Sequence, residues 1–248
     1  WSTPEEPEDI EADLFVIGPE QPLVDGLADE LRAKGKLVFG PGKLGAEIEG
    51  SKARMKNLLG AAGVPTAEYR VVSHFSGLES KVGHFFRGGR NGCVVKTDGL
   101  AAGKGVKVCL TAAEAYKDAI AKLQGESFGD AGRTLVIEEL LGKPDGSNCY
   151  ERSVFALVRV DEHGWTRQLV PVMAQDYKPL NAEPGSPNTG GMGCYAPTGD
   201  EDKLEQWAQI CIDPVLEMMY RLGIPYVGFM YFGLMIVDGE PFVLEINV

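Results

Sequence analysis

The segment from Val94 to Val108 constrains the fold more than any other part of the chain. It reads as two β-branched strands joined by a glycine-rich loop that carries a lysine near each end. The residues that give it this character are Lys96, Gly99, Gly103, Lys104 and Gly105. A loop of this composition can close backbone amides and ammonium groups over a polyphosphate. A plain hairpin turn is the alternative, although turn chemistry alone does not require the two lysines.

Two common phosphate motifs do not fit this segment. A P-loop needs four residues between its glycines and a Ser or Thr after its lysine, whereas here three residues separate Gly99 from Gly103 and Gly105 follows Lys104. A dinucleotide fingerprint should open a helix, whereas residues 106–108 continue as a strand. A hairpin that covers phosphate therefore remains the favoured interpretation.

Charge and cysteine content narrow the class of protein. The chain has 24 basic and 36 acidic residues, a formal net charge of −12, which argues against general affinity for nucleic acid or an anionic membrane. The five cysteines include no C-x-x-C pair, which indicates a reducing compartment and argues against a zinc site. With no apolar run of membrane-spanning length and no signal peptide, we expect a cytoplasmic protein. Because Trp1 opens the chain and a strand-like run closes it, we also expect a fragment of a longer protein.

The first 62 residues predict a parallel β-α-β unit followed by helix. Strands are expected at residues 13–17 and 37–39, with a helix between them. The turn at 18–20 follows the first strand, where open α/β sheets usually bind ligands, although a scaffold role is equally consistent with the pattern. Residues 43–62 read as one or two helices, with Ser51 as a plausible N-cap beside Lys52. The Val-Pro-Thr run at 64–66 then marks a boundary.

Two later stretches carry further candidates. The buried strand expected at 134–141 ends in Glu138 and Glu139, which either line a nucleotide cleft or mark the wet end of a sheet. Residues 175–198 form a long loop with charge at Asp176 and Lys178 and a glycine-rich end. Such a loop is either functional or disordered, and close approach to a ligand explains its glycines best.

The C-terminal region predicts a helix at 200–222, kinked at Pro214, and then strands at 227–231, 234–237 and 243–247. By strand alternation, Glu245 and Asn247 share one face of the last strand, with Leu244 and Ile246 on the other. A carboxylate and a carboxamide suit a hard cation such as Mg²⁺, although an isolated pair of this kind is more often a polar outer face.

In their order along the chain, these features resemble an ATP-grasp ligase, and more narrowly the phosphoribosylamine-glycine ligase (glycinamide ribonucleotide synthetase) family. The resemblance covers nearly the whole chain. Its most specific motifs are Asp-Gly-Leu-Ala-Ala-Gly-Lys-Gly at 98–105 and Pro-Asn-Thr-Gly-Gly-Met-Gly at 187–193. The others are Gly-Pro-Glu-Gln-Pro-Leu-Val (18–24), Glu-Gly-Ser-Lys (49–52), Phe-Gly-Asp-Ala-Gly (128–132), Val-Ile-Glu-Glu (136–139) and Gly-Leu-Met (233–235).

The resemblance implies an α/β fold of the α+β ATP-grasp type. Residues 1–50 would be the C-terminal part of a small parallel-sheet substrate domain, and residues 51–248 a truncated ATP-grasp domain with a mobile glycine-rich lid at about 69–139. The implied enzyme joins glycine to 5-phosphoribosylamine through glycyl phosphate and yields glycinamide ribonucleotide, ADP and phosphate, a step of purine biosynthesis. It would use ATP with Mg²⁺ or Mn²⁺ and need no covalent nucleophile, and it would be a monomer or be fused to other purine-pathway domains.

The same resemblance implies three groups of site residues. For ATP they are Lys52, Lys96, Gly99, Gly103, Lys104, Gly105, Glu138, Glu139 and Glu151. For the metal ion they are Glu245 and Asn247. For the other substrates they are Gly18, Pro19, Glu20, Asp176, Lys178, Asn188, Thr189, Gly190, Gly191, Met192 and Gly193.

The chain departs from the family pattern in its long loop. Tyr177 and Pro179 occupy positions where the family usually has His and Arg, which puts the contacts to phosphoribosylamine in question. Two other hypotheses therefore stay open. One is an ATP-grasp ligase with a different amine acceptor, and the other is a nucleotide-binding protein without ligase activity.

Overall fold

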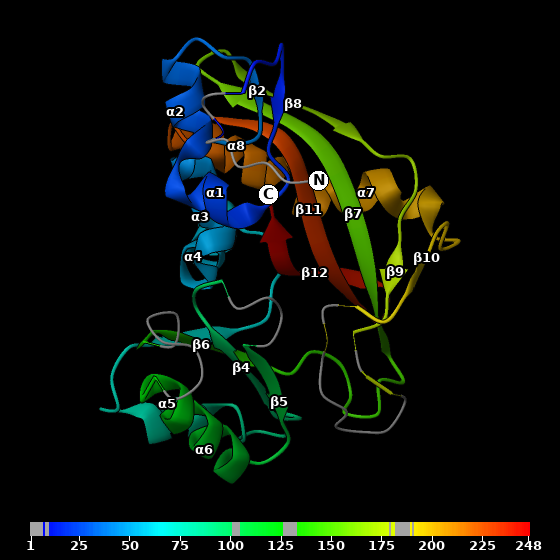
Figure 1. Cartoon of the computed structure of the whole chain (residues 1–248). Coiled ribbons are helices and arrows are strands. Elements are labelled where there is room, and N and C mark those ends of the chain that lie inside the picture. The colour runs from blue at the N-terminus through cyan, green and yellow to red at the C-terminus, as the bar shows by residue number, and fades with distance from the viewer. Residues whose placement is uncertain are drawn as a thin grey trace.

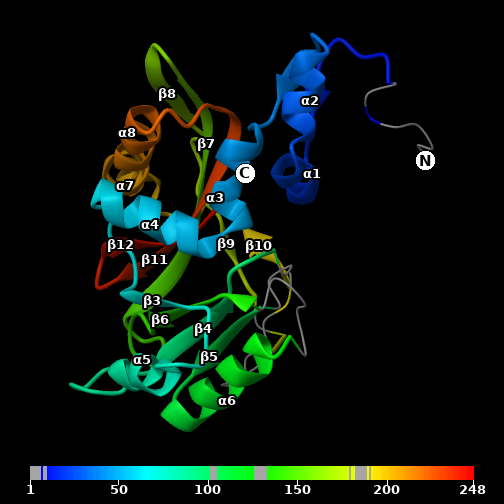
Figure 2. The ribbon, with the colours of Figure 1, turned by 90° about the vertical axis from the view of Figure 1, so that its left-hand side faces the viewer.

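Two antiparallel four-stranded sheets form the framework of the chain, one above the other in Figure 1. The computed structural model describes residues 7, 10–100, 105–125, 133–178, 180, 181, 189 and 191–248. Helices cover one face of each sheet, and a small N-terminal unit lies beside the upper sheet (Figures 1 and 2). This arrangement of layers confirms the predicted α/β class with an ATP-grasp type of architecture.

The N-terminal unit contains the predicted parallel strand pair, with Phe15 opposite Val38. Its helices pack around a small core of Leu23, Ala28 and Ala46. The elements are β1 (Phe15–Val16), α1 (Glu20–Asp25), α2 (Leu27–Ala33), β2 (Val38–Phe39) and α3 (Lys43–Gly50).

The upper sheet has the strand order β12-β11-β7-β8. Alternate residues of β7 and β11 enter the largest core, where α4, α7 and α8 cover the sheet. The opposite face of the same strands is free to line a cavity. The elements are α4 (Lys52–Ala62), β7 (Cys149–Asp161), β8 (Gly164–Leu169), α7 (Leu204–Cys211), α8 (Asp213–Arg221), β11 (Tyr226–Val237) and β12 (Glu240–Asn247). Two short strands, β9 (Gln175–Asp176) and β10 (Cys194–Tyr195), pair beside this sheet, and a 3₁₀ turn (Glu201–Lys203) precedes α7.

The lower sheet has the order β3-β6-β4-β5, and two helices cover its outer face. Its core consists of residues between 72 and 137 only, separate from the core of the upper sheet. The glycine-rich segment is a hairpin of this sheet, as predicted, with Lys96 opposite Val106. The elements are β3 (Tyr69–Val72), α5 (Leu78–His84), β4 (Cys93–Thr97), β5 (Val106–Cys109), α6 (Ala112–Leu123) and β6 (Leu135–Glu139).

Three local predictions are wrong in the C-terminal third. The expected kinked helix is two helices, because the chain breaks at Ile212 and Pro214 stands in the first turn of α8, where its missing N–H has no cost. The two strands expected at 227–231 and 234–237 are one strand, β11. Gly233 does not interrupt this strand. A Cβ at this position would lie 3.0 Å from Glu245 Cγ and from the Tyr231 hydroxyl, so the close packing there favours glycine.

The third error concerns Leu244. Gly233 pairs with Glu245 but Leu234 pairs with Val243, so Leu244 is the extra residue of a β-bulge. Strict alternation therefore fails at this point: Val243 and Ile246 enter the core, while Leu244, Glu245 and Asn247 line the same cavity. The predicted common face for Glu245 and Asn247 is confirmed, and the predicted opposite position of Leu244 is not.

Within the described ranges, no helix is long and apolar enough to cross a membrane.

The turn that leads into β4 gives a stability prediction. Gly92 has a φ of +136°, and a Cβ there would lie 2.5 Å from the Cys109 carbonyl oxygen, so Gly92→Ala should cost more than about 2 kcal/mol. Gly88→Ala is the matched control, because Gly88 has a φ of +67° and open space around it, and should cost about 1 kcal/mol. Urea unfolding followed by circular dichroism measures both. Equal losses would contradict the close approach at Gly92.

Candidate active site

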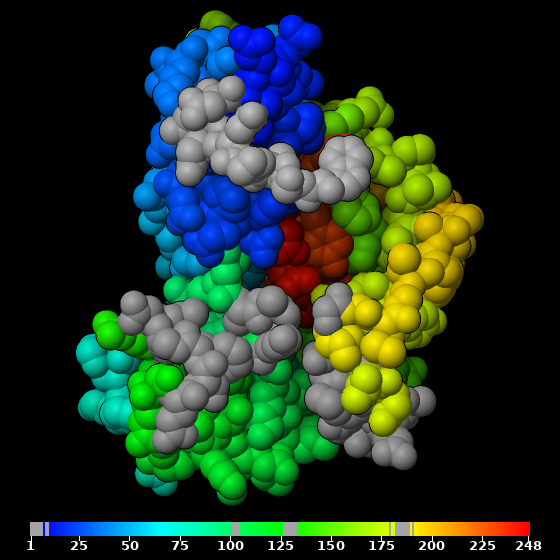
Figure 3. Space-filling model, in the orientation of Figure 1, coloured from blue at the N-terminus to red at the C-terminus, as the bar shows by residue number. Residues whose placement is uncertain are grey.

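A cavity of about 710 Å³ lies between the two sheets, within the usual size range of small-molecule sites. Figure 3 shows it as a hollow with the red C-terminal strand at its floor. The lower sheet contributes residues of β4, β5 and β6, and the upper sheet contributes residues of β7, β11 and β12. Residues from the segment 174–194 close one side.

Part of the cavity is an apolar slot. Val94, Val106 and Val108 face it from the hairpin, since alternation sends Cys93, Val95 and Cys109 into the lower core instead. Met235 and Leu244 face it from the upper sheet, and Ala67, Leu140, Leu141 and Phe155 complete the lining. An apolar slot between two sheets can hold a flat ring.

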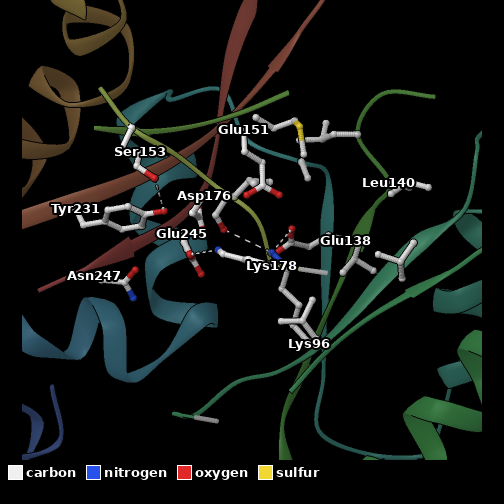
Figure 4. Close-up of a pocket in the computed structure, with 18 of the residues that line it drawn as sticks. Lys96, Glu138, Leu140, Glu151, Ser153, Asp176, Lys178, Tyr231, Glu245 and Asn247 are labelled. Atoms are coloured by element: carbon white, nitrogen blue, oxygen red, sulfur yellow. Dashed lines mark hydrogen bonds and ion pairs between the residues drawn. The ribbon is translucent and has the colours of Figure 1, made fainter. Parts of the chain in front are cut away.

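The predicted residue Lys96 is joined to Glu138 in a buried charge network. Lys96 Nζ lies 2.9 Å from one oxygen of Glu138, and Lys56 Nζ lies 3.2 Å from the other. Lys56 also donates to the Thr66 hydroxyl at 2.6 Å. Burial lowers the pKa of Lys56 to about 8, against the attraction of Glu138. The Glu138 carboxylate is therefore paired with two lysines, of which Figure 4 shows Lys96. Glu139 accepts a hydrogen bond from the Glu68 amide at 2.8 Å.

Lys52 begins α4 next to the glycine-rich hairpin. Its Nζ donates to the Gly99 carbonyl at 3.1 Å, and the Asp98 carboxylate accepts from the Ala53 amide at 2.7 Å. Ser51 is the N-cap, as predicted, and accepts from the Arg54 amide. Burial, followed by the neighbouring Lys96, lowers the pKa of Lys52. The contacts place an ammonium group and a helix N-terminus beside the hairpin.

Acidic and amide oxygens gather on the opposite wall. Glu245 lies 3.0 Å from Lys178 Nζ, and Asn247 donates its amide to Glu49 at 2.8 Å, which leaves the Asn247 carbonyl oxygen for a ligand. Burial acts to raise the pKa of Glu245, but the charge and hydrogen bond of Lys178, together with the charges of Lys96 and Lys52, lower the pKa overall. Burial raises the pKa of Glu151, and burial with Glu245 raises that of Tyr231 to about 12.

The oxygens of Glu245 and Asn247 suit a hard cation that also binds water or phosphate. In the described part of the chain, no three His, Cys, Asp or Glu side chains form a metal-binding group. Glu245 and Asn247 nevertheless line the same cavity and offer two oxygens. Mg²⁺ is usually held by one or two protein oxygens, with phosphates and water completing its sphere.

The long loop has its own hydrogen-bond ladder where it is described. Thr189 donates from its amide and its hydroxyl to the Lys178 carbonyl at 2.7 and 2.9 Å. Tyr177 donates to the Gly193 carbonyl at 2.9 Å and accepts from the Met192 amide at 2.8 Å. Asp176, Lys178 and Thr189 line the cavity, whereas Met192 is exposed.

Several predicted residues do not join this cavity or fall outside the description. Gly18 and Pro19 follow β1 and Glu20 opens α1, and none of the three lines the cavity. Glu20 does act on Glu49, whose pKa is raised mainly by burial and further by the charge of Glu20. The predictions at Gly103, Lys104, Asn188 and Gly190 lie outside the described residues, as does Pro179.

Lys56, Tyr231 and Met235 are among the residues of this region that the sequence analysis does not assign. Signals for them exist. Lys56 stands four residues after Lys52 and so shares its helix face. Tyr231 and Met235 are spaced by an even number along β11, opposite to the core positions Phe232 and Leu234.

Comparison with known proteins gives consistent results. A model described as the phosphoribosylglycinamide synthetase N domain matches residues 6–49, and one described as the ATP-grasp (A) domain of the same synthetase matches residues 50–248. The phosphoribosylamine-glycine ligase of Rhodopirellula baltica is 43% identical over 240 residues, which are 95% of this chain and 52% of that protein. The chain thus spans about half the length of the curated relatives it matches.

Comparison with solved structures supports the same family and fold. Phosphoribosylamine-glycine ligase from Thermotoga maritima superposes with a TM-score of 0.78 at 30% identity and covers 97% of this chain and 56% of that one. The biotin carboxylase domain of 2-oxoglutarate carboxylase from Hydrogenobacter thermophilus, in complex with MgADP, reaches a TM-score of 0.67 at 16% identity, covering 95% and 48%. The latter likeness shows a shared fold alone.

The buried Lys56 predicts a specific pH dependence of stability. Its pKa is about 8 in the folded protein and 10.5 ordinarily, so between these values the unfolded chain binds more protons than the folded one. The free energy of unfolding should therefore gain a contribution that rises from pH 8 to 10.5, by roughly 3 kcal/mol at most. The difference between the original chain and Lys56→Met, measured by urea unfolding at each pH, isolates it. Parallel curves across this window would contradict the lowered pKa of Lys56.

Proposed function

Because the chain belongs to the phosphoribosylglycinamide synthetase family, we propose that it is the ATP-binding part of a ligase that joins glycine to 5-phosphoribosylamine. The products are glycinamide ribonucleotide, ADP and phosphate. One observation carries the proposal: a single cavity combines an apolar slot between the sheets with Lys96 on the lower wall and the Glu245 and Asn247 oxygens on the upper wall. This is the division that a nucleotide with a bound cation requires.

We assign the ATP contacts accordingly. The adenine lies in the slot bordered by Val94, Val106 and Met235, with backbone groups near Glu138 and Glu139 at its edge. Lys52, Lys96 and Lys104 bind phosphates, and Gly99, Gly103 and Gly105 let the hairpin backbone approach them. Glu151 accepts from the ribose. Glu245 and Asn247 hold Mg²⁺ or Mn²⁺, which neutralises charge on the phosphates when it is bound.

The reaction follows from positioning and charge. A glycine carboxylate attacks the γ-phosphate in line, which forms glycyl phosphate and releases ADP. The amine of phosphoribosylamine then attacks the acyl carbon, the amide bond forms and phosphate leaves. The protein holds the reactants in reach and offers ammonium groups to the charge that spreads over the transferred phosphoryl group, so no covalent nucleophile is needed.

The remaining predicted residues are assigned to the other substrates. These are Gly18, Pro19, Glu20, Asp176, Lys178, Asn188, Thr189, Gly190, Gly191, Met192 and Gly193. We further propose residues 1–50 as part of the substrate domain, 51–248 as the ATP-grasp domain and about 69–139 as its lid. In support of the lid, the core of the lower sheet is built from residues of that range alone.

A different amine acceptor is the second candidate. Tyr177 is exposed and stands between Asp176 and Lys178, which line the cavity, and its ring lies 6.3 Å from that of Tyr195 with 31° between their planes. Two aromatic rings offer a stacking surface where the family usually has a histidine. This observation favours an acceptor with a planar group.

The deciding experiment is ADP formation by the complete protein with Mg²⁺-ATP. Release that needs both glycine and phosphoribosylamine, generated in place, supports the ligase. Release with glycine and an unrelated amine at equal rate supports the second candidate. Nucleotide binding with no release under any combination would contradict both and indicate a binding protein.

Glu245→Gln tests the metal assignment. The change removes the charge of the carboxylate but keeps its shape, so turnover should fall by about 100-fold or more while the melting temperature changes little. Glu240→Gln, at an exposed position of the same strand, is the matched control and should leave turnover unchanged. Both are compared at saturating Mg²⁺, where retained turnover in Glu245→Gln would show the assignment to be wrong.

A further inference from the structure

A closed ring of polar contacts links the two sheets on the floor of the cavity. It begins at β12, where the Val243 carbonyl accepts from the Thr66 hydroxyl at 2.6 Å. Thr66 accepts from Lys56 at 2.6 Å, and Lys56 faces Glu138 of β6 at 3.2 Å. Glu138 faces Lys96 of β4 at 2.9 Å, and Lys96 returns to β12 through the Leu244 carbonyl at 3.5 Å.

The ring has the charges of two lysines and one carboxylate. Glu138 is fully buried, and a buried carboxylate is costly unless it is paired. Lys56 takes one of its oxygens, so that only the other remains for Lys96. The excess positive charge then belongs to Lys96, which lines the cavity, whereas Lys56 is completely buried and cannot reach a ligand there.

We propose that Lys56 is a positioning residue, which through Glu138 fixes the Lys96 ammonium group in the cavity and holds the lower sheet against β12. Without Lys56, Glu138 would have Lys96 as its one close cation among the described contacts, and the ammonium group would be drawn away from the phosphates. The inference rests on the proposed function in so far as Lys96 binds ATP phosphate. It also gives Glu138 a role that the resemblance did not imply.

Another buried lysine provides a matched control. Lys122 on α6 is also almost fully buried, lies 2.6 Å from Asp118 and donates to the Val95 carbonyl at 2.9 Å. It supports the same lower sheet but does not line the cavity or touch Glu138. A lysine that acts only on stability should behave like Lys122.

The test compares Lys56→Met with Lys122→Met in the complete protein. Four quantities are measured: the melting temperature, the Kd of MgADP by calorimetry, and the KM values for ATP and for glycine. Lys56→Met should raise the Kd of MgADP and the KM for ATP by about 10-fold or more, with the KM for glycine changed less than about twofold. Lys122→Met should lower the melting temperature but change neither nucleotide constant.

Two further variants keep the outcome clear. Lys56→Arg keeps the positive charge and should restore part of the lost nucleotide affinity. Thr66→Val removes the hydroxyl that accepts a hydrogen bond from Lys56, and it should also raise the Kd of MgADP. This variant replaces Lys56→Met in the test if Lys56→Met does not fold.

Nucleotide constants that stay unchanged in Lys56→Met and Thr66→Val, or that rise equally in Lys122→Met, would overturn the positioning role. The Kd of MgADP separates this result from failure of the proposed function. If the original protein binds MgADP but forms no glycinamide ribonucleotide, the proposed ligase function is wrong. The effect of Lys56→Met on the Kd of MgADP then still tests the positioning role. An original protein that binds no nucleotide overturns both.

Discussion

The pairing of one buried carboxylate, Glu138, determines how the two halves of this structure meet. A charge at this depth is stable only with close partners of opposite sign, and Lys56 and Lys96 come from different elements on either side of it. The helix α4 belongs to the upper body and the strand β4 to the lower sheet. Satisfying the carboxylate therefore fixes the distance between the sheets at the floor of the cavity.

The chemistry of the cavity follows from the alternation of its strands. Apart from Glu151, every cavity-lining residue of β4, β7 and β11 has at least one neighbour that is buried in a core, so the same strands supply stability and function. The lower sheet presents apolar side chains with Lys96, Glu138 and Glu139, and the upper sheet presents Glu151, Glu245 and the Asn247 amide. Lys178 offsets part of the acidic charge and, with Lys96 and Lys52, lowers the pKa of Glu245.

Much of this arrangement could be predicted from local sequence. The glycine-rich hairpin, the N-cap Ser51 and the parallel N-terminal strands all depend on residues close together in the chain. The bulge at Leu244 could not be predicted, because it depends on how β12 pairs with β11. The break at Ile212 is similar: Pro214 suits a kinked helix or a new first turn, and packing decides between them.

The same distinction holds for the site, where local features can be predicted and long-range contacts cannot. The shared face of Glu245 and Asn247 follows from their two-residue spacing, but the ion pair of Glu245 with Lys178 joins residues 67 positions apart. Glu138 was predicted at the cleft, yet its partners were not, because neither Lys56 nor Lys96 is near it in sequence. Long-range charge pairing is set by tertiary structure, and no local pattern records it.

A crystal structure of the chain with Mg²⁺ and a non-hydrolysable ATP analogue tests this nucleotide site most directly. We expect the adenine between Val94, Val106 and Met235, with the phosphates reaching from Lys96 toward Glu245 and Asn247. A nucleotide bound outside this cavity, or one whose phosphates point away from Lys96, would contradict it.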